Sequence, residues 1–240
     1  MTNYTSRSQK LHNDLKQIID STPTGEKLLT EPLLARQLGV SRATLREAMR
    51  IFETQGLLRR RQGSGTYVMR PAHVIETGLE VLESIETLAR RINLEVSMGA
   101  LRLETRPDSE DEAKAFGARS GNEVTSLTRV ILAESRPVAY LVDVLPVDVL
   151  TVAEVEQGFQ GSVLDLLLKR GTPELSNSRS EISAVTATAE IARALGIQRG
   201  DVLLKFTSYL YTTSGRVIDY SQSYFLPGYF RFHVIRRVGG

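Results

Sequence analysis

Apolar residues recur at the spacing of an amphipathic helix in three segments of the first 56 residues. The pattern predicts helices over residues 8–19, from residue 31 to Leu38, and from residue 42 to the position before Gly56. Residues typical of caps, first turns, tight turns and stops mark the boundaries: Thr30, Pro32, Gly39, Ser41 and Gly56. The short connection between the second and third segments indicates a helix-turn-helix.

Residues 57–68 predict a β-hairpin directly after these helices. Two short strands flank a glycine-rich tip, Gln62-Gly63-Ser64-Gly65, and Arg59, Arg60 and Arg61 add positive charge beside it. Three helices followed by a basic hairpin predict a winged helix-turn-helix domain over residues 1–70. This fold places its recognition helix in the major groove of DNA.

The helix that follows Ser41 carries polar side chains suited to DNA on the face opposite its apolar stripe. They lie at or after its N-terminal end: Arg42, Thr44, Arg46 and Arg50. Arginine binds phosphates or the edge of guanine, and the sequence leaves both roles open. The alternative is a solvated basic face on an ordinary helical domain. The agreement of spacing, caps and wing favours DNA binding.

The same residues resemble the GntR family of bacterial transcription regulators. The matching pattern starts at Leu34 and ends at Val68, as LxxxLxVSRxTxREAxxxxExxGLxxxxxGxGTxV. The resemblance implies DNA contacts from the helix and from the wing tip. With the neighbouring polar and wing residues, the candidate DNA-binding set is Ser41, Arg42, Thr44, Arg46, Arg50, Gln62, Gly63, Gly65 and Thr66. The chain departs from the family at Thr30-Glu31-Pro32, where an arginine is usual, so one contact is expected to be missing.

The charge of the chain is unevenly distributed. Residues 1–70 carry a net charge of +6 and residues 71–240 a net charge of −4, so the basic surface coincides with the winged helix. The chain has no cysteine, and its three histidines have no ligand spacing, so we expect neither a disulfide nor a metal or other cofactor. Without an apolar span or signal peptide, we expect a cytoplasmic protein with no membrane partner.

After a linker at residues 71–76, the pattern changes towards alternation and predicts a second domain over residues 77–240. A helix is expected over residues 75–92. The remaining helices are predicted at residues 108–116, 162–170 and 187–195, and strands at 96–104, 124–132, 138–145, 178–185, 202–211, 217–225 and 231–238. Consecutive hairpins indicate an α+β fold, with a largely antiparallel sheet and helices on one face.

This order resembles the UTRA effector domain of HutC-type GntR regulators, which is similar in fold to chorismate lyase. The resemblance depends on residues 129–146 (RVILAESRPVAYLVDVLP), 162–170, 192–196 and 217–221 (VIDYS). It implies a small-molecule pocket on the sheet and a homodimer formed largely through this domain. It argues against the all-helical effector domain of the other large branch of the family.

The candidate effector-binding residues are polar side chains that alternate with apolar ones along predicted strands: Arg129, Asp143, Ser180, Asp219, Ser221 and Ser223. If three residues, 134–136, close the hairpin, Arg129 lies opposite Leu141, and both charges share a face. A two-residue closure would separate them. The alternative role for Arg129 and Asp143 is an internal ion pair that holds the sheet together.

The resemblance also bears on the effector. Relatives that respond to sugar phosphates carry arginine, glutamate and tyrosine where this chain has Ile131, Leu141 and Phe225. We therefore expect a less charged or partly apolar effector rather than a phosphosugar.

The sequence predicts a homodimeric regulator, most simply a repressor, that binds a near-palindromic double-stranded operator with an affinity that an effector changes. Two alternatives remain open. One is a chorismate-lyase-like enzyme domain tethered to DNA, although no catalytic constellation is visible. The other is a dimeric DNA binder that responds to no small molecule.

Overall fold

The computed structural model describes residues 7–61, 63–69 and 74–236. Their contacts divide the chain into two units. The first unit comprises Met1–Val74 together with Pro227–Tyr229, and the second comprises Ile75–Leu226 and Phe230–Gly240. Pro71 and the rest of the first half of the expected linker, residues 71–73, lie outside the described residues, while its last two positions belong to a strand.

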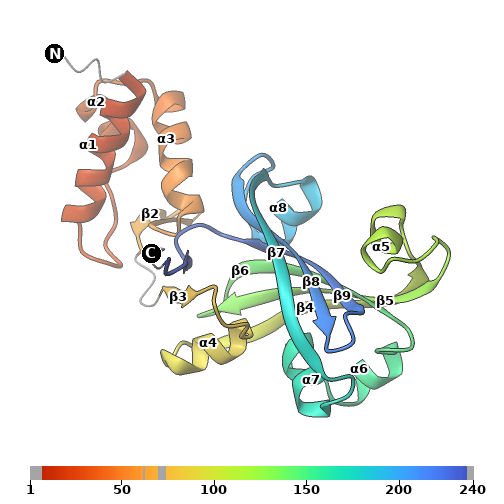
Figure 1. Ribbon diagram of the computed structural model, residues 1–240. Helices are drawn as coiled ribbons and strands as arrows, with labels where there is room; N and C mark the ends of the chain where they lie inside the picture. Colours follow the sequence, from red (N-terminus) through yellow and green to blue (C-terminus); the bar gives the residue numbers. More distant parts are fainter. Residues whose placement is uncertain (1–6, 62, 70–73, 237–240) are drawn as a thin grey trace. The chain divides into compact units, whose positions relative to one another are not determined.

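The first unit is a three-helix bundle with a two-stranded hairpin, as the sequence predicted (Figure 1). Its elements are α1 (Arg7–Ser21), α2 (Glu31–Gln37), α3 (Arg42–Thr54), β1 (Leu58–Arg61) and β2 (Gly65–Val68). Leu45, Met49 and Phe52 of α3 are buried at helical spacing and pack with residues of α1 and α2. Burial of this stripe fixes which face of α3 remains at the surface.

The turns of the first unit follow their local chemistry. Ser41 is the N-cap of α3, and its hydroxyl oxygen accepts a hydrogen bond from the Thr44 amide at 3.1 Å. Thr30 occupies the N-cap position of α2 but makes no side-chain cap hydrogen bond. Gly39, with a φ of +65°, makes the turn between α2 and α3.

The second unit is built on a six-stranded sheet with the order β4-β5-β6-β9-β8-β7, in which every neighbouring pair is antiparallel. The strands are β4 (Val96–Pro107), β5 (Glu123–Ala133), β6 (Arg136–Pro146), β7 (Leu175–Thr186), β8 (Val202–Thr212) and β9 (Val217–Phe225). The predicted antiparallel α+β architecture is confirmed.

Two predictions at the ends of this unit were wrong or only partly right. Instead of one helix over residues 75–92, the chain forms strand β3 (Ile75–Gly78) and a short helix, α4 (Ile85–Arg91), that Ser84 caps. The last predicted strand, residues 231–238, is present only in part: β10 (Phe230–His233) pairs with β3 in parallel, residues 234–236 are not in a strand, and residues 237 and 238 lie outside the described residues. The apolar residues at 79–82 suggested a continuous helix. They lie outside any helix and line a cavity described below, which is why they are apolar.

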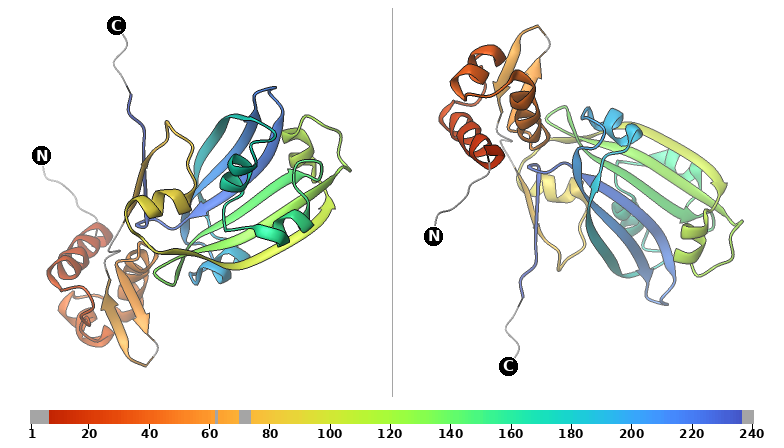
Figure 2. Two further views of the ribbon diagram at one scale, coloured as in Figure 1. Left: turned by 90° about the horizontal axis from the view of Figure 1, so that it is seen from below. Right: turned by 90° about the horizontal axis from the view of Figure 1, so that it is seen from above.

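Helices cover both faces of the sheet, so the prediction of helices on one face was also wrong. The other helices are α5 (Glu110–Ala115), α6 (Val152–Gly158), α7 (Val163–Arg170) and α8 (Ala189–Leu195). In Figure 2, α6 and α7 lie in front of the sheet in one view and behind it in the other, whereas α8 does the reverse. Leu127 and Leu145 pack with residues of α6 and α7, while the Tyr140 hydroxyl donates to Glu190 of α8 at 2.9 Å. Alternation along the strands produces this division.

The β5–β6 hairpin has the predicted register but a different turn. Arg129 pairs with Leu141, and Leu127 pairs with Asp143. The loop contains two residues, Glu134 and Ser135, both with positive φ, and a shift in register between Ile131 and Leu132 adds the missing residue. A two-residue turn followed by a bulge therefore gives the same facing as the expected three-residue loop.

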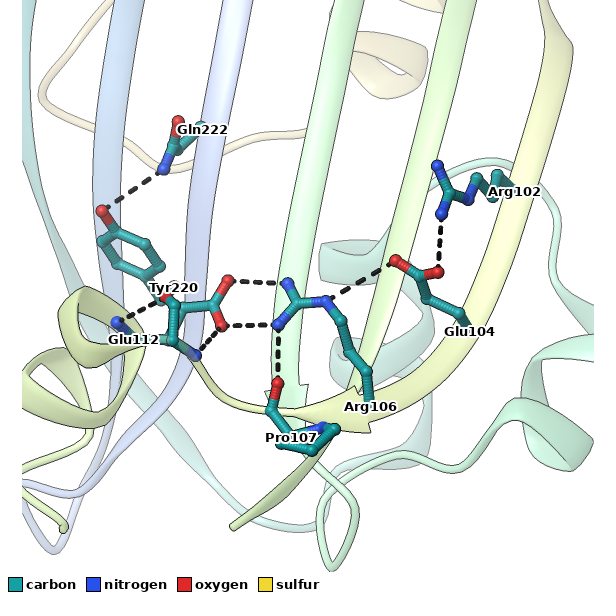
Figure 3. A network of polar contacts seen from close by, with 8 residues as sticks. Arg102, Glu104, Arg106, Pro107, Glu112, Tyr220 and Gln222 are labelled. Atoms are coloured by element: carbon teal, nitrogen blue, oxygen red, sulfur yellow. Dashed lines mark hydrogen bonds and ion pairs between the residues drawn. The ribbon is translucent and has the colours of Figure 1, made fainter. Parts of the chain in front are cut away.

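A network of polar contacts holds α5 on the face opposite α6 and α7 (Figure 3). Both terminal nitrogens of Arg106, on β4, donate to the Glu112 carboxylate at 2.7 Å. Glu112 also accepts from the amide of Ser109, with which it forms a capping box. These contacts connect the edge strand β4 to the helix that follows it.

Candidate functional site

The N-terminal turn of α3 presents an exposed polar face. Arg42, Thr44 and Arg46 are exposed, because the opposite stripe of the helix is buried in the core of the first unit. The Ser41 hydroxyl is occupied by capping and lies 2.8 Å from the Thr44 hydroxyl. Among the described residues, Arg42 makes no ion pair, so its guanidinium is available to an external anion.

Glu31 joins α3 to the wing. Its carboxylate accepts from Nε of Arg46 at 2.9 Å and also pairs with Arg60 of β1. Its side chain is only 16% exposed, so the two arginines enclose it. Glu31 belongs to the segment Thr30-Glu31-Pro32, in which the sequence differs from the family pattern. It orients two basic side chains towards the same surface.

The remaining candidate DNA-binding residues differ in their environments. Arg50 of α3 forms an ion pair with Glu47 at 2.7 Å. Gly63 and Gly65 have φ values of +73° and +124°, in the region that favours glycine. The Thr66 side chain is buried and does not present its hydroxyl at the surface. It is therefore not placed for a side-chain contact with DNA. Gln62 lies outside the described residues.

The second unit contains a cavity of about 480 Å³ on the sheet face that α6 and α7 also cover. Its floor consists of neighbouring residues in register across five strands. One row runs from Arg129 through Leu141, Ser223 and Phe206 to Ile182, and the next from Asp143 through Ser221 and Ser208 to Ser180. β3, α4 and residues 79–84 supply walls. The volume is typical of small-molecule sites.

The structure places all six candidate effector-binding residues around this cavity: Arg129, Asp143, Ser180, Asp219, Ser221 and Ser223. They come from β5, β6, β7 and β9, which are separated by up to about a hundred residues in the sequence. Leu141 and Phe225, two positions where the chain departs from phosphosugar-responsive relatives, line the cavity as well. Ile131 is buried and is not part of the lining.

Arg129 and Asp143 bind each other inside the cavity. Nη1 of Arg129 donates to the Asp143 carboxylate at 2.6 Å, and the two residues are 5% and 7% exposed. Burial raises the pKa of Asp143, and the Arg129 guanidinium opposes that rise. The internal ion pair weighed from the sequence is therefore present, and it forms part of the cavity lining.

Asp219 is an acidic residue of the cavity lining whose hydrogen bonds are incomplete. It is 7% exposed, and its Oδ1 has no hydrogen-bond partner among the described residues. Burial raises its pKa well above the ordinary value, the neighbouring Asp143 raises it further, and Arg129 opposes the rise. A buried carboxyl oxygen without a partner is costly, which is typical of sites that await a ligand.

Sequence reasoning missed several lining residues. Glu86 of α4 lines the cavity, and its Oε1 also has no partner among the described residues. Burial raises its pKa, while Arg129 lowers it. Phe206 and Ser208 of β8 and Phe232 of β10 were missed too. Alternation along β8 was a signal for the first two, but only the tertiary fold brings α4 and β10 to this face.

No helix within the described ranges is both long enough and apolar enough to cross a bilayer.

Comparisons with known proteins agree with both units. Residues 7–68 match the family described as bacterial regulatory proteins, gntR family, and residues 92–231 match the UTRA domain. The chain is 28% identical over 196 residues to the HTH-type transcriptional repressor NagR of Bacillus subtilis. The aligned region covers 82% of this chain and 79% of NagR. It is 26% identical over 211 residues to the mannosyl-D-glycerate transport/metabolism system repressor MngR of Escherichia coli, covering 88% and 87% of the two chains.

Solved structures show the same fold. The crystal structure of PhnF from Mycobacterium smegmatis superposes with a TM-score of 0.64 at 21% identity, over 95% of this chain and 100% of PhnF. Two adjoining family matches in this order, together with full-length relatives that are transcriptional regulators, define a DNA-binding regulator whose activity responds to a ligand. The chain belongs to the GntR family of bacterial transcriptional regulators, in the HutC-type branch that carries a UTRA domain.

Proposed function

We propose that this regulator is a homodimeric repressor that binds a near-palindromic operator with one α3 helix and one wing per half-site. The exposed Arg42 and Arg46 at the N-terminal end of α3 carry this proposal, because that end of the recognition helix enters the major groove in helix-turn-helix proteins. The net charge of +6 on residues 1–70 adds attraction to phosphates. The repressor names of NagR and MngR favour repression over activation.

The proposed contacts divide by chemistry. Arg42 would reach the groove with a guanidinium that makes no ion pair among the described residues, and Thr44 with a hydroxyl that shares a hydrogen bond with Ser41. Gly63 and Gly65 would let the wing backbone approach the sugar-phosphate chain. Arg46 and Arg60 would share their charge between Glu31 and a phosphate. Thr66 would contribute through the position of its backbone, since its side chain is buried.

The second unit is proposed to bind an effector in the sheet cavity without transforming it. One argument concerns which effectors fit. Arg129 is the one arginine that lines the cavity, and Asp143 already neutralises it. A phosphate group would meet no free positive charge among the described lining residues, so a phosphosugar is not the proposed effector.

Coupling between the two functions requires that the effector bind two arrangements of the dimer with different affinity. Typical coupling free energies of about 1–3 kcal/mol change operator affinity by roughly 5- to 150-fold. This sets the size of the response that an operator-binding assay must resolve.

Fluorescence anisotropy of labelled duplex from the gene's own upstream region tests the proposal. Arg42→Ala is expected to weaken operator binding by roughly 10-fold or more, as a lost arginine contact does. Arg193→Ala removes the same charge from the exposed surface of α8 and serves as the control. Unchanged affinity in Arg42→Ala, or an equal loss in both variants, would contradict the assignment of α3.

A further inference from the structure

The cavity of the second unit is more acidic than its ion pair suggests. Five acidic residues line it. Glu80 accepts from the amide of Ile235 and Glu83 pairs with Arg91. The other three, Glu86 from α4, Asp143 from β6 and Asp219 from β9, share the single guanidinium of Arg129. Arg129 and Asp143 both lie close enough to Glu86 and to Asp219 to shift the pKa of each carboxyl. Pairing of Arg129 with Asp143 leaves two acidic groups without a cation.

Both groups have unused hydrogen-bonding capacity, as has the donor Nε of Arg129. Oδ1 of Asp219 and Oε1 of Glu86 are buried atoms with no partner among the described residues. Asp219 is more than nine-tenths buried and is part of the cavity lining, so a donor bound in the cavity would lie beside its carboxyl group. A bound cation would supply both the donor and the missing charge.

The rest of the lining suits a molecule with hydroxyl groups and a carbon skeleton. Ser180, Ser208 and Ser221 form part of one cross-strand row, and the first two share a hydrogen bond of 2.7 Å. Serine hydroxyls both donate and accept. Phe206 and Phe232, with ring centroids 4.6 Å apart, provide an apolar surface beside this row.

We propose that the cavity binds a small hydroxylated organic cation whose ammonium group lies between Asp219 and Glu86. The inference rests on the proposed role of this cavity as the effector site and specifies the chemical class of the effector. The serine row would hold the hydroxyl groups, and the phenylalanine rings would pack against the carbon skeleton. The Arg129–Asp143 pair would remain intact and orient the floor.

The pKa shifts of the two carboxyl groups agree with this assignment. Burial raises the pKa of both Asp219 and Glu86 by more than the Arg129 guanidinium lowers it. An ammonium group beside them would favour the ionised forms again. A phosphate or carboxylate in the same place would add a like charge to a site that already lacks cations.

The test uses matched pairs of compounds that differ by one amino group. Calorimetry on the full chain compares 2-amino-1,3-propanediol with glycerol, glucosamine with glucose, and 2-aminocyclohexanol with 1,2-cyclohexanediol, and adds glycerol 3-phosphate as an anion. We expect at least one amine to bind at millimolar or lower concentration and to bind more tightly than its hydroxyl counterpart. Equal or tighter binding of the neutral or anionic compounds, or no amine binding at millimolar concentration, overturns the proposal.

Variants locate the ammonium group. Asp219→Asn keeps the shape of the side chain and is expected to weaken the amine on the order of 10- to 100-fold, as loss of a charge-assisted hydrogen bond does. Asp111→Asn makes the same change on the exposed surface of α5 and should leave amine binding unchanged. Equal affinity for the amine in Asp219→Asn and the parent chain contradicts the proposed position of the ammonium group.

Operator anisotropy in the same preparations separates this inference from the proposed function. If a neutral or anionic compound binds and changes operator affinity, the effector role of the cavity stands and the cation class is wrong. If an amine binds tightly but operator affinity does not change, the cation site stands and the effector role is wrong.

Discussion

Replacing Arg129 by Met isolates a buried carboxylate and allows its cost to be calculated. Nη1 of Arg129 lies 2.6 Å from the Asp143 carboxylate, and the two side chains are 6% and 11% exposed, so little of either group is in contact with bulk water. Methionine fills much of the space of the arginine stem and keeps the change mainly electrostatic. The free energy of unfolding should therefore fall through Asp143.

The magnitude follows from the option that Asp143 has of taking up a proton. Keeping a carboxyl neutral costs about 1.4 kcal/mol per pH unit above its ordinary pKa of about 3.9, which limits the loss to about 4 kcal/mol at pH 7 and about 1.5 kcal/mol at pH 5. Breaking buried ion pairs on one side typically costs about 3–5 kcal/mol, which agrees with the value at pH 7. The sign is fixed: removing Arg129 raises the pKa of Asp143 in the folded state, so stability is lost as pH rises.

Urea unfolding of the full chain, followed by tyrosine emission at pH 5 and pH 7, measures this loss. The chain has no tryptophan, and five of its eight tyrosines lie within residues 75–226, so the signal reports mainly the second unit. Asp143→Asn in the Arg129→Met background removes the titrating group and should remove the pH dependence of the loss. A loss that is equal at the two pH values, or below about 1 kcal/mol at pH 7, would refute the reasoning.

Three further changes have defined outcomes. Asp219→Asn should stabilise the ligand-free protein increasingly as pH rises from 5 to 8 in thermal melts, because burial raises the pKa of the native carboxyl and makes its ionised form destabilising; a constant difference would contradict this. Ser41→Ala removes the α3 N-cap and should lower the stability of the first unit by about 1 kcal/mol, seen as an earlier loss of helical circular dichroism on heating, whereas Ser64→Ala at the wing tip should not. Glu31→Gln frees Arg46 and Arg60 and should steepen the salt dependence of DNA binding by about one phosphate contact, so an unchanged slope would mean that neither arginine reaches the backbone.

Local signals were sufficient for the first unit. The N-cap at Ser41, the turn at Gly39 and the apolar stripe of α3 act over distances of a few residues, and the structure has each of them. The strands of the large sheet were predictable for the same reason, since alternation reveals a half-buried strand. α6 was missed although Thr151 and Glu154 form a capping box that the sequence displays.

The site depended on information of two kinds. Alternation and the facing of Arg129 and Asp143 could be predicted, because both follow from the period of a strand. Arg129 and Asp143 share a face because a two-residue turn and a bulge together have the effect of a three-residue loop. No pattern in residues 134–138 predicts this combination. Glu86 was not predicted as a lining residue because the apolar spacing of residues 75–92 resembles that of one long helix. In the structure, β3 pairs with β10 and only α4 remains of that helix.

The central claim is that α3 and the wing select DNA by sequence, and selection from a random pool of duplexes tests it most directly. The full-length chain is incubated with the pool at moderate ionic strength, and the bound fraction is amplified and sequenced over several rounds. The account predicts enrichment of a near-palindromic sequence with half-sites about one helical turn apart, and loss of that enrichment in Arg42→Ala. A bound fraction as diverse as the starting pool, identical for the parent chain and the variant, would contradict it.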